Sequence, residues 1–131
     1  MKYQQYLKRD AVKNYFPLPN EIFCLGLCSG EIAVYAYLLY CEDRKTFQCY
    51  PSYRTIGKAV GLSRNTVKKY VVGLEQKHLI VTEPTTIYTK DGVKRNGNLL
   101  YTILPIKQAV MRYYTQQLER AKLLQVQSKA G

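Results

Sequence analysis

Apolar positions recur at intervals of three and four residues over three stretches in the first part of the chain. This spacing predicts helices that begin near Ser29, Ser52 and Ser63, the third running to about Lys77. A serine directly before a helix favours its start, because the side-chain oxygen accepts a hydrogen bond from a free backbone N–H group. Gly61 ends the second helix and favours a tight turn before the third. The pattern therefore predicts one helix followed by two helices that a sharp turn joins.

Each predicted helix has one apolar face, and these faces are expected to form the core. The residues on them are Ile32, Val34, Tyr35, Leu38, Leu39 and Tyr40 in the first helix, Ile56, Ala59 and Val60 in the second, and Val67, Tyr70, Val71 and Leu74 in the third. Gly73 lies inside the third helix, where a glycine costs about 1 kcal/mol relative to alanine, and this indicates close packing.

Two β-prone segments follow the third helix. They are "LIVTEPTTIYT" and "NLLYTIL", and the segment "KDGVKRNGN" between them has turn signals at Asp91-Gly92 and Asn96-Gly97. This pattern predicts a β-hairpin whose tip carries Lys90, Lys94 and Arg95. Pro105 then suits the first turn of a last helix. An apolar stripe along that helix is formed by Ile106, Val110, Tyr113 or Tyr114, Gln117, Ala121 and Leu124.

Three regions follow from this order. Residues 1–20 are expected to form an N-terminal arm, because the two prolines of "FPLPN" prevent a continuous helix. Residues 21–104 form a mainly α-helical domain with a β-hairpin, and residues 105–131 form a C-terminal helix. We therefore expect one compact domain, flanked by an arm and a helix.

The charge of the chain is strongly positive and unevenly distributed. The 131 residues carry a formal net charge of +11. Residues 53–98 hold 9 basic and 3 acidic side chains, whereas residues 1–52 hold 6 and 5. A basic excess of this size favours polyanions, either nucleic acid or an anionic membrane surface. The excess begins where the two helices joined by the turn are predicted.

Other classes of function have less support in the sequence. The four cysteines, Cys24, Cys28, Cys41 and Cys49, have spacings of C-x3-C and C-x7-C, which differ from the common zinc patterns, so free thiols are expected and a zinc site is the alternative. No apolar run is long enough to span a membrane, and the predicted location is the cytoplasm. The few acidic residues are scattered and no glycine-rich phosphate loop is present. We expect neither catalysis nor a cofactor or metal.

The segment "YPSYRTIGKAVGLSRNTVKKYVVGLEQKHLI" resembles the winged helix-turn-helix of bacterial DNA-binding proteins. The resemblance includes GntR-like transcriptional regulators and the helix-turn-helix domains associated with plasmid and mobile-element replication initiators. It implies a winged helix-turn-helix fold in which the third helix enters the major groove of double-stranded DNA. The residues that it places against DNA are Ser63, Arg64, Asn65, Thr66, Lys68 and Lys69 in the third helix, Ser52, Tyr53, Arg54 and Thr55 at phosphates, and Lys90, Lys94, Arg95 and Asn96 in the wing.

The sequence departs from that family at one position. His78 stands where such proteins usually have a glycine that ends the third helix. A left-handed backbone is expected there, and histidine tolerates this conformation better than most residues. We therefore interpret His78 as a strained C-terminal cap of the helix.

These patterns leave alternatives open. The basic residues of the third helix and hairpin could be ordinary solvated charges, and Thr66 could simply bond to the backbone. The last helix could join two chains into a homodimer through its apolar stripe, or pack on its own domain. A transcriptional regulator without a small-molecule effector is the favoured function. The alternatives are a DNA-binding module for replication initiation and a protein-interaction module built on the same fold.

Overall fold

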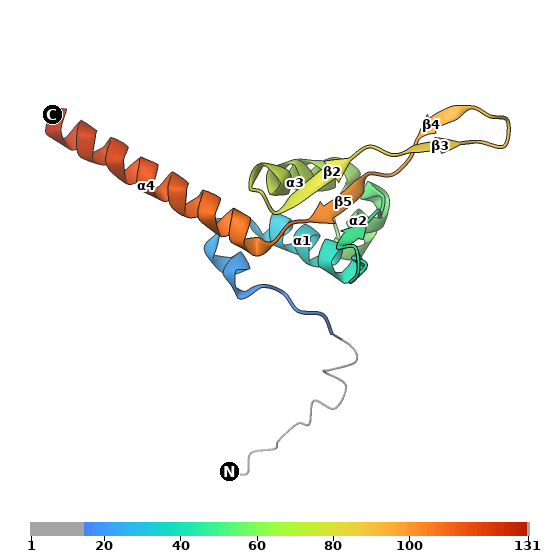
Figure 1. Ribbon diagram of the computed structural model, residues 1–131, viewed down its shortest axis with the longest axis horizontal. Helices are drawn as coiled ribbons and strands as arrows, with labels where there is room; N and C mark the ends of the chain where they lie inside the picture. Colours follow the sequence, from blue (N-terminus) through green and yellow to red (C-terminus); the bar gives the residue numbers. More distant parts are fainter. Residues whose placement is uncertain (1–14, 131) are drawn as a thin grey trace, which may run out of the picture.

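The computed structural model describes residues 15–130, with side chains up to residue 127, and it is a winged helix-turn-helix with a C-terminal helix (Figure 1). This architecture confirms the fold class that the sequence predicts. In chain order the elements are the 3-10 helix η1 (Asn20–Cys24), α1 (Ser29–Cys41), β1 (Gln48–Cys49), α2 (Tyr53–Val60), α3 (Arg64–Gln76), β2 (Ile80–Glu83), β3 (Thr86–Tyr88), β4 (Lys94–Asn96), β5 (Leu100–Ile103) and α4 (Ile106–Ala130).

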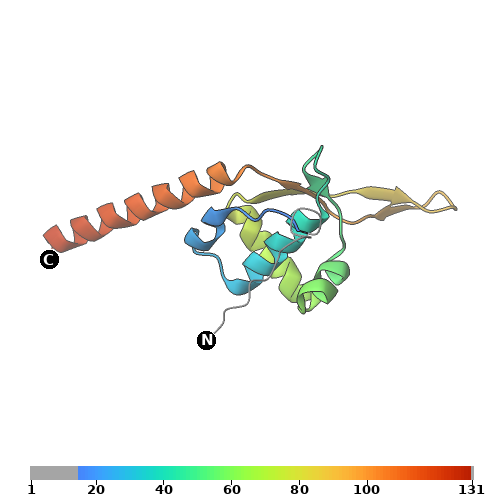
Figure 2. The same cartoon turned by 90° about the horizontal axis from the view of Figure 1, so that it is seen from below.

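The body of the molecule has two layers. Strands β1, β5 and β2 form an antiparallel sheet in that order, in which Gln48 and Val81 both pair with Thr102 of the central strand. Helices α1, α2 and α3 lie on one side of this sheet (Figure 2). The core between the layers includes the fully buried side chains of Ile22, Val34, Tyr35, Leu38, Ile56, Val67, Leu74, Leu79, Ile80 and Tyr101.

The start of α1 differs from the prediction by one residue. Cys28, not Ser29, is the N-cap, and Ser29 is the first residue of the helix. The reason lies in Glu31, whose carboxylate accepts a hydrogen bond from the Cys28 backbone N–H at 3.1 Å. A glutamate at the third helical position reaches back to the cap residue, so Glu31 fixes the cap at position 28.

Two residues assigned to the apolar helix faces are exposed. Tyr40 is 66% exposed at the end of α1, and Ala59 is exposed on α2. On α2 the buried positions are Ile56 and Gly57, because the helix has only eight residues and packs by its first turns against the turn before α3. The prediction was therefore wrong for Tyr40 and Ala59 and right for the central residues of each face.

The predicted hairpin is present, with one of its two predicted turns, and it differs from the prediction at Asn96-Gly97. Strands β3 and β4 pair beyond the three-stranded sheet and form a two-stranded ribbon, the wing, that projects from the body (Figure 1). Asn96-Gly97 is not a turn, because Asn96 pairs with Thr86 and the Gly97 N–H donates to the Thr85 carbonyl at 2.8 Å. The turn lies at Gly92, which has a φ of +78°.

This pairing moves two basic residues away from the tip. Lys94 pairs with Tyr88 and Arg95 pairs with Ile87, so both belong to β4. Lys90 remains in the tip loop. The predicted basic tip is therefore a ribbon with basic residues along one strand.

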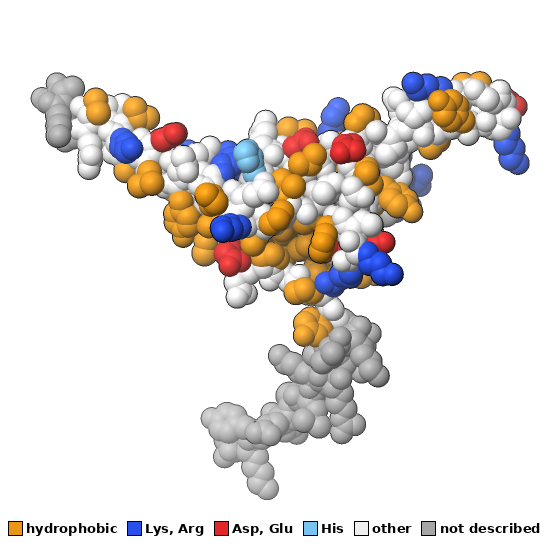
Figure 3. All heavy atoms as spheres, in the orientation of Figure 1, with side chains coloured by type: hydrophobic (Ala, Val, Ile, Leu, Met, Phe, Trp, Pro, Cys, Tyr) orange, Lys and Arg blue, Asp and Glu red, His pale blue; other side chains and the backbone are white. Residues whose placement is uncertain are grey.

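Helix α4 packs on the domain over its first turns only. Ala109 is buried, and Ile106, Val110 and Tyr113 are half-buried against the core. From there the helix projects from the body in the direction opposite to the wing (Figure 1). Its exposed large hydrophobic side chains are Met111, Tyr114, Leu118, Leu123, Leu124 and Val126, and Figure 3 shows hydrophobic side chains along this projecting part.

The N-terminal arm lies mostly outside the described residues, which begin at position 15. Within the described part, Phe16 and Leu18 are half-buried against the core and Tyr15 is exposed. The Phe16 ring lies 6.0 Å from that of Tyr40, centroid to centroid. Residues 15–18 therefore contact the domain.

The described residues also show the state of the cysteines, the arrangement of possible metal ligands and the character of the helices. Within the described residues the four cysteines are free thiols, with Cys49 buried and Cys24 and Cys28 exposed. No group of three or more His, Cys, Asp or Glu side chains is placed to hold a metal ion in that part of the chain. None of the helices between residues 15 and 130 has the length and apolar character needed to cross a membrane.

Candidate nucleic-acid interface

Helices α2 and α3 begin in the same way. The Ser52 side chain accepts a hydrogen bond from the Thr55 N–H at 3.1 Å, and the Ser63 side chain accepts one from the Thr66 N–H at 3.3 Å. In each pair the two hydroxyl oxygens are also bonded, at 2.9 Å and 2.8 Å respectively. Both serines are therefore caps, as predicted, and both threonines support them. The hydroxyl groups of Ser52 and Thr55 are thus bonded to each other, and so are those of Ser63 and Thr66.

The turn between α2 and α3 depends on two glycines. Gly61 has a φ of +74° and its N–H donates to the Gly57 carbonyl, which ends α2. Gly57 lies against the turn so closely that a β-carbon there would be 2.3 Å from the Leu62 carbonyl oxygen. The absence of a side chain at Gly57 therefore allows the turn to fold back onto α2 and sets the start of α3.

One face of α3 is anchored in the core. Val67, Val71 and Leu74 are buried, as the spacing predicted, and Tyr70 is half-buried. The Tyr70 ring packs on Gly30 of α1, where a β-carbon would be 2.2 Å from a ring atom. The two helices therefore approach closely at this glycine, and the packed side of α3 leaves its opposite face toward solvent.

The opposite face of α3 carries the predicted recognition residues. Arg64, Asn65, Lys68 and Lys69 are all exposed, and Thr66 is half-buried beside its cap. The Lys69 ammonium lies 5.9 Å from the centre of the Tyr70 ring, within the range of a cation–π contact. Four polar or basic side chains therefore lie on the exposed side of the first two turns of α3.

Sequence reasoning missed two exposed residues farther along this face. Val72 and Gln76 lie seven and eleven residues after Asn65, which is about two and three helical turns, so the three residues align. They line a shallow groove of about 740 Å³ together with Cys28, Glu31, Lys68, Lys69, Tyr70 and Gly73. The three- and four-residue spacing from Asn65 was the available signal for both residues.

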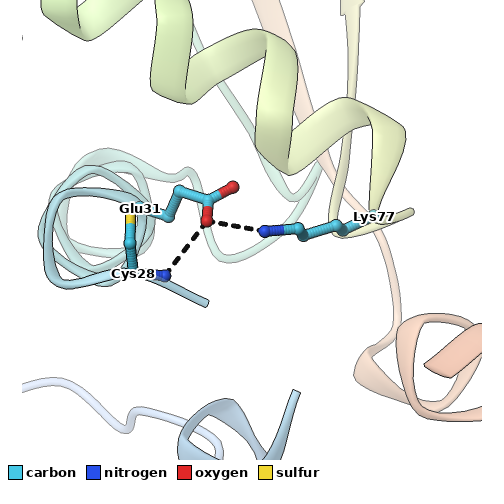
Figure 4. Close-up of polar contacts among 3 residues, drawn as sticks. All are labelled: Cys28, Glu31 and Lys77. Atoms are coloured by element: carbon cyan, nitrogen blue, oxygen red, sulfur yellow. Dashed lines mark hydrogen bonds and ion pairs between the residues drawn. The ribbon is translucent and has the colours of Figure 1, made fainter. Parts of the chain in front are cut away.

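An ion pair between a buried carboxylate and a half-buried lysine holds the far end of α3. The Lys77 ammonium lies 2.7 Å from Glu31 Oε1, and the same oxygen accepts the Cys28 N–H (Figure 4). Burial opposes ionisation of Glu31, but the hydrogen bonds from Lys77 and Cys28 outweigh it and lower the pKa of this carboxyl. Gly73 leaves room for the carboxylate, since a β-carbon there would be 2.5 Å from Glu31 Oε2. This contact explains the glycine inside α3.

The start of α2 and the root of the wing are neighbours. The Asn98 side-chain amide donates to the Tyr50 carbonyl at 3.2 Å, two residues before the Ser52 cap. A cavity of about 150 Å³ lies between them, lined in part by Ser52, Tyr53 and the buried Tyr101. Tyr53 is half-buried, and burial raises its pKa, whereas Arg54 and Thr55 are exposed.

The wing presents the other predicted contacts. Lys90, Lys94, Arg95 and Asn96 are all exposed. Figure 3 shows Lys and Arg side chains gathered toward the end of the ribbon. The ribbon also exposes Ile87, Tyr88 and Val93. It therefore combines positive charge with apolar and aromatic surface.

Comparisons with known proteins agree with this geometry. Residues 25–80 match the model of a family described as a helix-turn-helix domain, which runs from before α1 to the first residue of β2. The chain is also similar to the solved structure of a protein described as "Possible transcriptional regulator from Methanosarcina mazei Go1". That match has a TM-score of 0.52 at 17% identity and covers 80% of this chain and 82% of the other. At this identity the likeness shows a shared fold. No curated protein matches the chain.

The matched segment contains α1, α2 and α3, so these helices form a helix-turn-helix domain. The finer resemblance, to GntR-like regulators or to replication initiators, is not resolved by these matches and stays a prediction. The same holds for the roles of the individual residues on α2, α3 and the wing.

Proposed function

We propose that this protein binds double-stranded DNA through α3 and acts as a transcriptional regulator without chemistry of its own. The observation that carries the proposal is the exposed polar and basic face of α3, held by buried residues on its other side within a helix-turn-helix domain. A helix about 10 to 12 Å in diameter fits the major groove, where side chains distinguish the four base pairs.

The contacts divide into two kinds. Arg64 and Asn65 lie at the start of α3, where side chains reach base edges first. Arginine pairs with guanine and asparagine with adenine through two hydrogen bonds each. The exposed N-terminal turn of α2 and the basic wing bind phosphates, which positions α3 but carries no sequence information. Specific reading is therefore assigned to α3.

Selection from a random pool of double-stranded DNA at near-physiological salt tests this proposal. We expect an enriched sequence, and the arrangement of its half-sites distinguishes the two roles. An inverted repeat fits a dimeric regulator, whereas direct repeats favour a replication-initiation module. A pool that returns unenriched would contradict sequence-specific binding.

Variants of the base-contacting residues on α3 should change both the affinity and the base preference for the selected site. Arg64→Ala or Asn65→Ala should weaken binding by about 1–3 kcal/mol and relax the preference at one base position. Titration of each variant against single-base substitutions of the site measures both effects. If Arg64→Ala changes neither affinity nor preference, α3 is not the reading helix.

The wing variants should show a different signature. Lys94→Ala or Arg95→Ala should weaken binding to all duplexes alike and reduce the dependence of log K on log[salt] by about one unit per charge removed. Affinities at several salt concentrations measure this slope. Lys122→Ala on the projecting part of α4 is the matched control, and an unchanged slope in the wing variants would remove the wing from the interface.

We also propose that the chain forms a homodimer through α4. Beyond Tyr113 this helix has exposed residues as far as position 127, including apolar ones. Helices in proteins gain most of their stability from the packing of an apolar face, and a second copy of the stripe would cover Tyr114 and Leu124, which lie on it. A dimer would place two α3 helices on two half-sites of one DNA molecule.

A further inference from the structure

One apolar side chain stands in the polar surface of α3. Val72 is 44% exposed, and among the residues of α3, all of which the structure describes, it is the exposed large hydrophobic one. It lies about two helical turns beyond Asn65 on the same face, with Lys68 and Lys69 one turn before it and Gln76 one turn after. An apolar group therefore occupies the middle of the surface that faces the proposed ligand.

The fold does not explain a valine at this position. The core side of α3 is supplied by Val67, Val71 and Leu74, which are buried while Val72 points away. A β-branched residue also loses side-chain freedom in a helix, so alanine would be the better helix former at an exposed site. A contact outside the domain would give this valine an advantage over alanine that the packing of α3 does not supply.

The major groove presents one apolar group that differs between base pairs, the C5-methyl group of thymine. We infer that Val72 reads a thymine by packing against this methyl group, so the site of this protein contains a thymine whose methyl group contributes to affinity. This inference rests on the proposed DNA binding through α3. The polar residues around Val72 would contact neighbouring bases and phosphates.

The helix geometry also gives the place of this thymine. Val72 is seven residues from Asn65, a distance of about 10 Å along the axis of α3. Successive base pairs are about 3.4 Å apart along the DNA axis, and a helix in the major groove is inclined to that axis, so the two side chains reach bases about two to three positions apart. The thymine should therefore lie about two to three base pairs from the position at which Asn65→Ala relaxes preference.

Deoxyuridine provides a test, since it differs from thymidine only by lacking the methyl group. Each thymine of the selected site is replaced singly by deoxyuridine, and the affinity of the full chain is measured. We expect the wild type to lose about fourfold in affinity at one such position, the value of one buried methyl group. Val72→Ala should lose a similar factor on the thymine duplex and bind the thymine and uracil duplexes equally.

Two controls separate this result from misfolding. Val72→Ala replaces an exposed residue by a better helix former, so its melting temperature should equal or exceed that of the wild type. Val126→Ala makes the same change on an exposed turn of α4 and should leave the discrimination between thymine and uracil intact.

The outcomes also distinguish this inference from the proposed function. If a selected site binds equally well with every thymine replaced, or if Val72→Ala still discriminates at the sensitive position, the role of Val72 is overturned while sequence-specific binding stands. A protein that binds all duplexes alike overturns both.

Discussion

Glu31 connects the first and third helices through one oxygen atom. Its Oε1 atom accepts hydrogen bonds from the Lys77 ammonium and the Cys28 N–H, so a single carboxylate caps α1 and holds the end of α3. Glu31→Gln should lower the free energy of unfolding at pH 7 by about 1–3 kcal/mol, because it weakens two charge-assisted bonds. Urea unfolding measures this loss, and Glu119→Gln, on the exposed part of α4, is the control.

The same residue predicts a dependence of stability on pH. The pKa of Glu31 is lower in the folded protein than its ordinary value of 4.5. Its contribution is therefore fully present above that value and is lost as the pH falls through the folded pKa. We expect the melting temperature of the wild type to fall more steeply below pH 4.5 than that of Glu31→Gln. Parallel curves for the two proteins would rule out this linkage.

His78 adopts the left-handed backbone that the sequence predicted, with a φ of +62°. Its N–H donates to the Glu75 carbonyl and the Leu79 N–H donates to the Leu74 carbonyl, both at 3.1 Å, which is the Schellman arrangement at a helix end. Glycine adopts this backbone without strain, so His78→Gly should add about 1 kcal/mol of stability and roughly 4 °C to the melting temperature. His78→Ala should give no gain, and a clear fall for His78→Gly would refute the cap.

At the scale of the elements, the turn between α2 and α3 depends on space at Gly57. A β-carbon at this position would collide with the Leu62 carbonyl oxygen, which is backbone and cannot rotate away. Gly57→Ala should therefore destabilise the domain by about 1–3 kcal/mol, although alanine is the better helix former. Gly61→Ala, where the added carbon meets open space, should cost only the left-handed strain of about 1 kcal/mol. Equal urea midpoints for Gly57→Ala and the wild type would show that the turn can shift.

The elements also show which parts of the fold follow from local sequence. Ser52, Ser63 and Gly61 act within four residues along the chain, and their roles as caps and turn were predicted correctly. The cap of α1 was displaced because Glu31 is also held by Lys77, 46 residues away. The hairpin and its turn at Asp91-Gly92 were predicted correctly, but the second turn signal, Asn96-Gly97, was wrong because Asn96 pairs with Thr86 of β3.

In the candidate site, too, some features follow from local sequence and others do not. The exposed positions of Arg64, Asn65, Lys68 and Lys69 follow from helical spacing, and the structure places them as expected. Val72 was missed because an apolar residue within a helix is normally assigned to the core. Its spacing from Asn65 already places it on the polar face of α3, and the structure shows that it is exposed there.

At the scale of the whole molecule, α4 is the element whose role in assembly can be tested separately. Only its first turns contact the domain, so removing residues 116–131 should leave the fold intact while converting dimers to monomers. Sedimentation analysis measures this change, and the melting temperature reports on the fold. Dimers that persist after the truncation would exclude α4 as the interface.

A point substitution tests the same stripe more finely. Leu124→Glu places a charge on the proposed interface and should weaken dimers, since an unpaired buried charge is costly. Leu123→Glu adds the same charge about 100° away around the helix and should leave the dimer intact. Both residues are exposed in the monomer, so neither change should affect the fold.

The wing has a thermodynamic consequence of its own. A two-stranded ribbon with both faces exposed has little local stability, because few buried contacts oppose its opening. Its amide protons should therefore exchange with solvent within a short time in the free protein and much more slowly on DNA. Ordering the ribbon on DNA costs entropy, and this cost grows with temperature, so it should offset a growing part of the free energy that the positive charges of the wing contribute.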